Sequence, residues 1–194
     1  MTTATAVPEK TSARERLLAA AQELFYEEGI HTVGIERVIE RAGVAKASLY
    51  NTFGSKDELI RAYLQARQDS RRARLEQRLG ALATPREKVL AIFQDIGEMA
   101  GKPDYRGCAF VRASAELSRV SGVKNICDQS RLWLRALLTD LARAAEARDP
   151  EALARQLVLL YDGTAVSAQM DGPCDAGHAA RAAATQLLDA AGAP

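Results

Sequence analysis

Residues 45–53 combine a helical hydrophobic period with small and polar side chains that can form directed hydrogen bonds. On a helical wheel of about 100° per residue, with Leu49 directed to the core, Ala47 and Asn51 point away from the core. An Asn side chain can bond to an adenine edge through two hydrogen bonds, whereas Ser, Tyr and Lys suit phosphates or base edges. The candidate nucleic-acid contacts are Lys46, Ala47, Ser48, Tyr50 and Asn51, with Asn51 and Ser48 as base readers.

The flanking residues predict the elements that position this segment. Ser12 and Glu15 have the spacing of a capping box, which starts a helix, and Gly29 supplies the left-handed residue expected at its end. A second short helix over 35–41 is separated from the polar segment by Ala42-Gly43-Val44, the tight turn of a helix-turn-helix. The core side of the polar segment is expected to hold Ala45, Leu49, Thr52 and Phe53.

The rest of the chain also favours helices. It is rich in Ala, Leu and Arg, and no stretch shows the period-two alternation of a half-buried strand, so the predicted fold is all-α. Ser55 and Glu58 form a second capping-box pattern, and Pro85 and Pro150 stand at first helical positions behind Thr and Asp. The later helices are expected over 55–79, 84–99, 108–117, 122–147, 149–170 and 175–191.

Composition excludes several classes of protein. The 194 residues are 47% hydrophobic and 26% charged, with a formal net charge of +1, so any nucleic-acid contact must be local. Without a secretory signal or a long apolar run, we expect a cytoplasmic protein with no membrane segment. The odd number and wide spacing of Cys108, Cys127 and Cys174 indicate reduced packing residues.

Residues 12–60 resemble the DNA-binding domain of the TetR family of bacterial regulators. The resemblance is carried by Gly29, by the stretch 42–50, by Phe53-Gly54-Ser55-Lys56 and by Glu58-Leu59. It implies a three-helix DNA-binding head, a helical regulatory domain, a homodimer through the last two helices, and release of operator DNA when a small molecule binds. The residues that match the family's DNA contacts are Lys46, Ser48, Tyr50 and Asn51 in the recognition helix and Lys56 at the start of the fourth helix.

The resemblance also has departures. Val33-Gly34 stands where many members carry a hydroxyl cap, and Thr52 replaces an aromatic residue or His. Neither change alters the expected organisation. This is a flexible arm over 1–10, a helix-turn-helix DNA-binding domain over 11–55, and a helical regulatory and dimerisation domain over 56–194.

A ligand pocket is a further expectation for the second domain. Apolar side chains on separate predicted helices could converge on it, although residue by residue ordinary core packing explains them better. Cys108, Gln94, Asp128 and Arg131 would be its polar groups. The candidate lining residues are Phe93, Met99, Cys108, Phe110, Trp133, Leu137 and Tyr161.

Other charged residues suggest no chemistry. The six arginines within 61–80 are read as a solvated helix face, with a nucleic-acid stripe as the alternative. His31 and His178 lack partners at metal-ligand spacing, and no Gly-rich phosphate loop or catalytic triad is present. We therefore expect no catalytic residues, no metal site and no cofactor.

The last two predicted helices carry small residues on their apolar stripes, a pattern suited to a four-helix dimer bundle, although a monomer could bury the same stripes internally. The function expected is that of a dimeric, ligand-responsive transcriptional repressor. Its partners would be double-stranded operator DNA, an unidentified small-molecule effector and a second copy of the chain. The alternative is a helical protein-interaction regulator with a degenerate DNA-binding head. A helical-bundle enzyme lacks the residues it would need.

Overall fold

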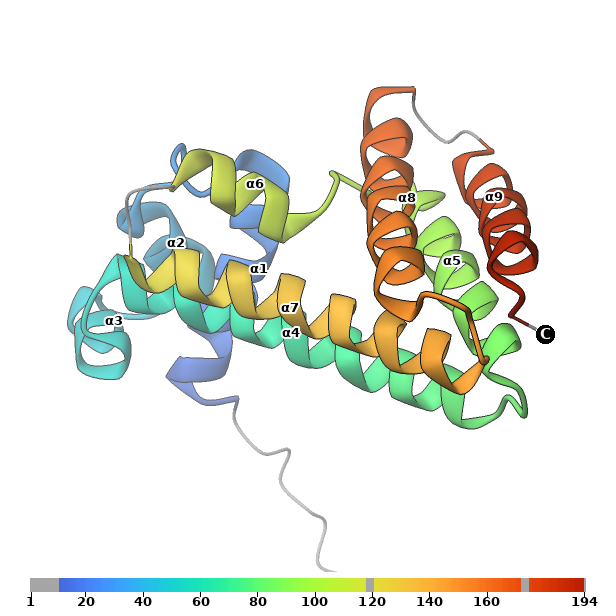
Figure 1. The fold of residues 1–194 in the computed structure, drawn as a ribbon. Coiled ribbons are helices and arrows are strands. Elements are labelled where there is room, and N and C mark those ends of the chain that lie inside the picture. Colours follow the sequence, from blue (N-terminus) through green and yellow to red (C-terminus); the bar gives the residue numbers. More distant parts are fainter. Residues whose placement is uncertain (1–10, 118–120, 172–174, 194) are drawn as a thin grey trace, which may run out of the picture. The chain divides into compact units, whose positions relative to one another are not determined.

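The computed structural model describes residues 11–117, 121–171 and 175–193, and these residues form α-helices and no strands (Figure 1). The predicted all-α fold is confirmed. The expected arm over 1–10 and Cys174 lie outside the described residues. The helices are α1 (Ala13–Glu28), α2 (Ile35–Ala42), α3 (Lys46–Phe53), α4 (Lys56–Gly80), α5 (Pro85–Ala100), α6 (Ala109–Glu116), α7 (Ser121–Ala144), α8 (Pro150–Met170) and α9 (Ala176–Ala191).

The chain divides into two compact units after Tyr63, inside α4. The N-terminal unit contains α1, α2, α3 and the first two turns of α4, and the C-terminal unit contains the rest. The boundary predicted from the sequence lies about two helical turns earlier, between residues 55 and 56. None of the described helices is both long and apolar enough to cross a membrane.

Local signals define the helices of the N-terminal unit. The Glu15 amide donates to Ser12 Oγ at 3.2 Å and the Ser12 amide donates to the Glu15 carboxylate at 2.8 Å, which completes the predicted capping box. Gly43 ends α2 in the left-handed conformation with φ +62°. Gly29 also has a positive φ of +96°, but its ψ of 148° is extended, so the predicted left-handed cap is wrong there.

The core of the N-terminal unit brings α1, α2 and α3 together around buried aliphatic and aromatic side chains. Leu49 of α3 is fully buried, and the Phe25 and Tyr63 rings meet edge to face at 5.7 Å. Phe53 is half-buried, but Ala45 and Thr52 are exposed, so their predicted inward placement is wrong. Because α3 has only eight residues and Ala45 is its N-cap, the contact with the core is narrower than the wheel implies.

The C-terminal unit packs α5, α7, α8 and α9 around one apolar core, with α6 against α7 (Figure 1). Thr84 and Asp149 cap α5 and α8 through their side chains, and a proline follows each cap as predicted. The core residues include Phe93, Leu138 and Leu157, each of them fully buried. In Figure 1, α8 and α9 run side by side.

Within the C-terminal unit, arginines in the second half of α4 contact α5 and α7. Arg74 donates two hydrogen bonds to the buried Asp95 of α5, at 2.8 and 3.0 Å, and Arg78 pairs with Glu98. The Arg72 guanidinium lies 5.3 Å from the centre of the Trp133 ring. The interpretation of this run as a solvated face is therefore wrong for these residues, because α5 and α7 supply partners that a helical wheel of α4 does not include.

Candidate functional site

The exposed face of α3 is the first candidate site. Ala47 and Asn51 are exposed, Tyr50 is 43% exposed, and Ser48 is half-buried at the edge of the same face. The fully buried Leu49 fixes the helix on the opposite side. The N-terminal unit thus presents a short helix with a polar exposed face. The small side chain of Ala47 on this face would let the helix backbone come close to a bound partner.

Lys46, at the start of α3, already has an acidic neighbour. Its ammonium lies 3.1 Å from the Glu36 carboxylate of α2, and both side chains are mostly exposed. The hydrogen bond to Glu36 raises the pKa of Lys46, so the ammonium stays charged. An exposed pair of this kind is weak, so the ammonium can exchange Glu36 for another anion at little cost.

Lys56 makes structural contacts within the N-terminal unit, whereas its phosphate contact stays a prediction. Its ammonium donates to the Ile30 carbonyl at 2.9 Å and lies 6.0 Å from the centre of the Phe25 ring. These contacts tie the start of α4 to the end of α1.

Two arginines outside the set predicted from the sequence contact the helix-turn-helix turn and the end of α3. Arg16 of α1 donates to the Gly43 carbonyl in the helix-turn-helix turn at 3.1 Å, and Arg14 lies 5.6 Å from the centre of the Phe53 ring. Gly43 is the signal in the sequence that could have identified Arg16. It marks the end of α2, where backbone carbonyls have no partner in the helix and need a hydrogen-bond donor.

The C-terminal unit contains a second candidate site, a cavity of about 300 Å³ among α4, α6, α7 and α8. Its charged side chains are Arg71, Asp128, Arg131 and Asp162. Arg131 pairs with Asp162, and Asp128 lies 2.5 Å from the Lys124 ammonium. The lining residues are Arg71, Cys108, Phe110, Val111, Ser114, Cys127, Asp128, Ser130, Arg131, Tyr161 and Asp162.

The cavity brings together only some of the predicted pocket residues. Cys108, Phe110 and Tyr161 line it, together with the predicted polar groups Asp128 and Arg131. Four candidates do not line this cavity: Phe93 is in the core, Trp133 and Leu137 pack against the core, and Met99 is half-buried on α5. Periodicity identified their apolar faces but could not say whether those faces meet a cavity or another helix.

Burial keeps two cavity residues uncharged. Burial raises the pKa of the Cys127 thiol to about 11 and that of the Tyr161 hydroxyl to about 12. Both groups therefore stay protonated near neutral pH. Arg71 also lines this cavity, although the sequence pattern predicts that the arginines of α4 share one exposed surface.

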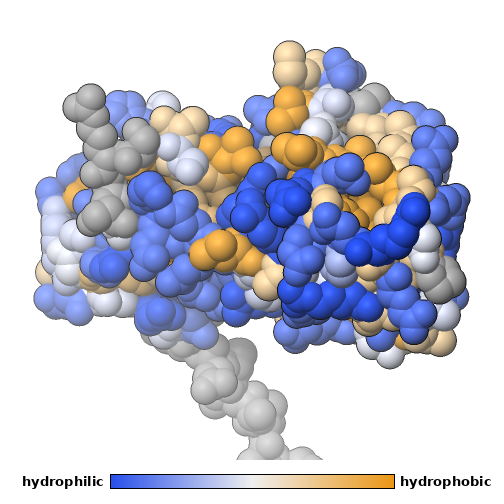
Figure 2. Space-filling model, in the orientation of Figure 1, coloured by the Kyte–Doolittle hydropathy of each residue, from blue (hydrophilic) through white to orange (hydrophobic). Residues whose placement is uncertain are grey.

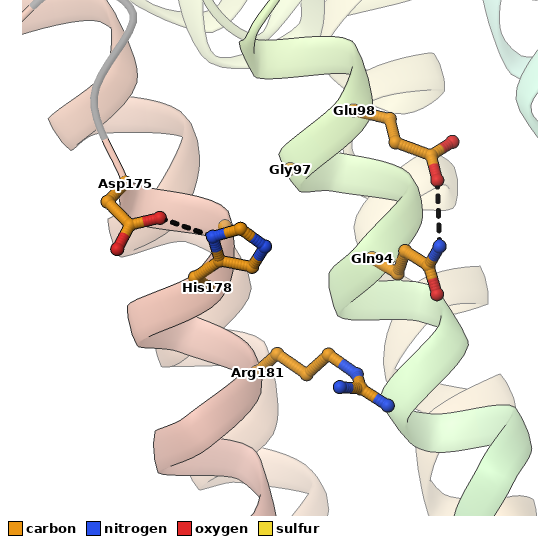
Figure 3. Close-up of a pocket in the computed structure, with 7 residues that line it drawn as sticks. Gln94, Gly97, Glu98, Asp175, His178 and Arg181 are labelled. Carbon is orange, nitrogen blue, oxygen red and sulfur yellow. Dashed lines mark hydrogen bonds and ion pairs between the residues drawn. The ribbon is translucent and has the colours of Figure 1, made fainter.

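A separate polar groove of about 470 Å³ lies between α5 and α9 (Figure 3). Gln94 lines this groove and not the cavity, and its amide donates to Glu98 at 2.9 Å. On the α9 side of the groove, the Asp175 carboxylate contacts the His178 ring at 2.5 Å, and Arg181 extends toward α5. Within the described residues, no three His, Cys, Asp or Glu side chains gather as a metal-binding cluster.

The fold and these sites define a helix-turn-helix protein with an all-helical second unit. Residues 17–63 match the family model of bacterial regulatory proteins of the tetR family. A TetR-family transcriptional regulator from Streptomyces coelicolor is 32% identical and has a TM-score of 0.88, with 92% of this chain and 95% of that one covered. A tetR-type regulator from Streptomyces avermitilis is 35% identical with a TM-score of 0.86, covering 95% of this chain and all of that one. The chain belongs to the TetR family, whose matched members are transcription regulators and not enzymes.

Curated relatives match over shorter stretches. The transcriptional activator FasR of Mycolicibacterium smegmatis is 38% identical over 40% of this chain and 36% of its own length. The transcriptional repressor NemR of Escherichia coli is 28% identical over 65% of each chain. The chain thus spans between about one third and two thirds of the length of these curated relatives.

Proposed function

We propose that the protein is a dimeric transcriptional regulator that binds operator DNA through α3. The observation that carries this proposal is the exposed polar face of α3. The buried Leu49 anchors α3 in the core, and Arg16 donates a hydrogen bond to the turn that precedes it. A second helix of a helix-turn-helix enters the major groove with such a face. Asn51 and Ser48 would read base edges, Ala47 would allow close approach, and Lys46, Tyr50 and Lys56 would contact the backbone.

Electrostatics favours a binding mode that needs two subunits. Residues 1–60 contain seven basic and nine acidic side chains, and Lys46 forms an ion pair with Glu36. A single N-terminal unit therefore offers few charges to phosphates, and its non-specific affinity would be low. Two recognition helices about 34–36 Å apart would supply the missing affinity.

The surface of α8 supports dimerisation. Leu159, Val166 and Met170 are 68%, 45% and 79% exposed and share one face, where Gly163 leaves open space. Apolar areas are visible over α8 in Figure 2. On α9, Ala179, Ala182 and Ala190 are exposed and Ala183 is half-buried, and small residues of this kind permit close helix approach. Exposed apolar side chains that share one helix face favour a protein interface, and we infer that two copies pair through α8 and α9.

A ligand in the cavity would control DNA binding. An effector that binds more tightly to the subunit arrangement with wrongly spaced recognition helices shifts the population away from DNA. We propose repression relieved by such an effector, in line with the repressor among the matched relatives. A regulator of chromosomal DNA would act in the cytoplasm.

The test is fluorescence anisotropy with the intergenic DNA beside the protein's own gene and a scrambled duplex of equal length, over a salt series. A preference of about 10³-fold for the natural DNA, with two chains per site, would support the proposal. Equal weak binding to both duplexes would contradict it and favour a protein-interaction regulator. Light scattering of the Leu159→Glu variant should show monomers where the parent protein forms dimers.

A further inference from the structure

Arg71 carries the one charge in the cavity lining that has no opposite charge beside it among the described residues. Arg131 has Asp162, Asp128 has Lys124, and farther along α4 the buried Asp95 receives Arg74. The hydrogen bonds of Arg71 go only to the neutral groups of Gln68 and Ser130. A partly buried cation in this setting favours an anionic ligand.

The guanidinium of Arg71 is held firmly in place. Its Nη2 donates to Gln68 Oε1 at 2.8 Å, to Ser130 Oγ at 2.7 Å and to the Ser130 carbonyl at 3.1 Å. The ring centres of Phe110 and Trp133 lie 5.1 and 5.0 Å from its central carbon. A cation fixed on three sides loses little further freedom when a ligand binds.

Arg71 also has hydrogen-bond donors to spare. Within the described part of the chain, its buried Nε has no hydrogen-bond acceptor and its Nη1 donates to no protein group. A guanidinium has five N–H donors, and the contacts above use only those of Nη2. Because Nε is buried, the Nη1 donors are the ones left to serve a ligand in the cavity.

The Tyr161 hydroxyl provides a second donor to the same space. Tyr161 lines the cavity although it is only 6% exposed, and no described residue forms a hydrogen bond with its hydroxyl. Arg71 and Tyr161 line the same cavity, and the charge of Arg71 partly opposes the effect of burial on the pKa of the Tyr161 hydroxyl. Phe110, Val111 and the two cysteines make much of the remaining wall apolar.

We propose that the effector is a small organic acid with an apolar body, whose carboxylate is held by Arg71 and Tyr161. The inference rests on the proposed ligand response and names its chemical class. One unpaired guanidinium matches the single charge of a monocarboxylate, and a cavity of about 300 Å³ suits a small ligand. The apolar wall would receive the hydrocarbon part.

The experiment compares acids with their uncharged amides, because each pair differs in charge and hardly in shape. The probes are benzoate, phenylacetate and octanoate, each against its amide, added to the full chain. Trp133 is the sole tryptophan and stacks on Arg71, so its fluorescence reports binding directly. We expect at least one acid to bind about tenfold or more tightly than its amide.

Variants assign the effect to the cavity. Arg71→Gln should remove the preference for the acid, and Tyr161→Phe should weaken it. Arg135→Gln removes an exposed charge from α7 and should leave the preference unchanged. Circular dichroism and DNA binding would establish that each variant is folded.

The outcomes separate this inference from the proposed function. Absence of acid binding, equal binding of acid and amide, or a preference that persists in folded Arg71→Gln would overturn the inference, whatever the DNA assay shows. Acid binding that depends on Arg71 but leaves the operator complex intact would support the inference and contradict the proposed ligand response.

Discussion

The backbones of Gly97 on α5 and Gly177 on α9 meet so closely that a Cβ atom built on Gly97 would lie 2.8 Å from the Gly177 Cα. The reverse construction gives 2.5 Å to the Gly97 Cα. No side chain separates the helices at this point, which lies in the groove of Figure 3. The packing of α5 against α9 therefore depends on two residues that are 80 positions apart.

Gly97→Ala should destabilise the C-terminal unit. The added methyl group meets backbone, which cannot rotate away, so we expect a net loss of about 1–3 kcal/mol after the helix preference of Ala is counted. Thermal unfolding followed by circular dichroism measures the loss. Gly80→Ala is the matched control, since a Cβ there meets no atom within 4 Å. Equal unfolding temperatures for the two variants would show that α5 and α9 can move apart at little cost, which would contradict the prediction.

Asn51→Ala should weaken binding to the natural operator by about tenfold or more and leave scrambled DNA unaffected, because a paired amide contact to adenine is specific. Tyr50→Ala, in contrast, should weaken binding to both duplexes by similar factors. Anisotropy titrations at one salt concentration compare the variants. A uniform loss for Asn51→Ala would remove its assignment as a base reader.

Glu36→Gln should strengthen DNA binding by a small factor of about two to five, because Lys46 no longer has to leave a carboxylate to reach phosphate. Glu40→Gln makes the same charge change on α2 without a contact to Lys46 and serves as the control. Affinity for operator and scrambled DNA should rise together. Identical gains in the two variants would mean that net charge, and not the pair, is responsible.

Asp95→Asn should destabilise the C-terminal unit, because Arg74 would lose its carboxylate partner in a largely dry site. Asp95 is 2% exposed, whereas the Arg74 side chain is 36% exposed, so we expect a loss of about 1–3 kcal/mol. Glu98→Gln removes a half-exposed carboxylate from Arg78 and should cost under about 1 kcal/mol. Chemical denaturation gives both free energies, and a reversed order would contradict this assignment.

The Cys127 thiol should react slowly with iodoacetamide at pH 8. Burial raises its pKa from 9.0 to about 11, so the reactive thiolate is about a hundredfold rarer than in the unfolded chain. Its reactivity should increase only as the pH rises toward that value. Mass spectrometry of the peptide containing Cys127, from native and unfolded protein, gives the two rates. Similar rates would show that the thiol is accessible and ionised.

The amino-acid sequence by itself determined the features whose causes lie within a few residues. Ser12 with Glu15, Thr84 before Pro85, and Gly43 each act on neighbouring backbone, so helix starts and the helix-turn-helix turn could be predicted. The family resemblance rests on the same segment. The exposed face of α3 followed from its period, although Ala45 and Thr52 showed that a short helix buries less than a wheel suggests.

Only the tertiary structure decided which distant side chains meet. In the sequence, Arg71 is one of six similar arginines of α4. In the structure, it is distinguished by its contacts with Gln68, Ser130 and the rings of Phe110 and Trp133. Phe93 and Tyr161 both lie on apolar helix faces and belong to the buried core, yet of these two only Tyr161 also lines the cavity. The physical reason is that periodicity gives the direction of a side chain on its own helix, whereas the order in which helices pack gives its neighbours.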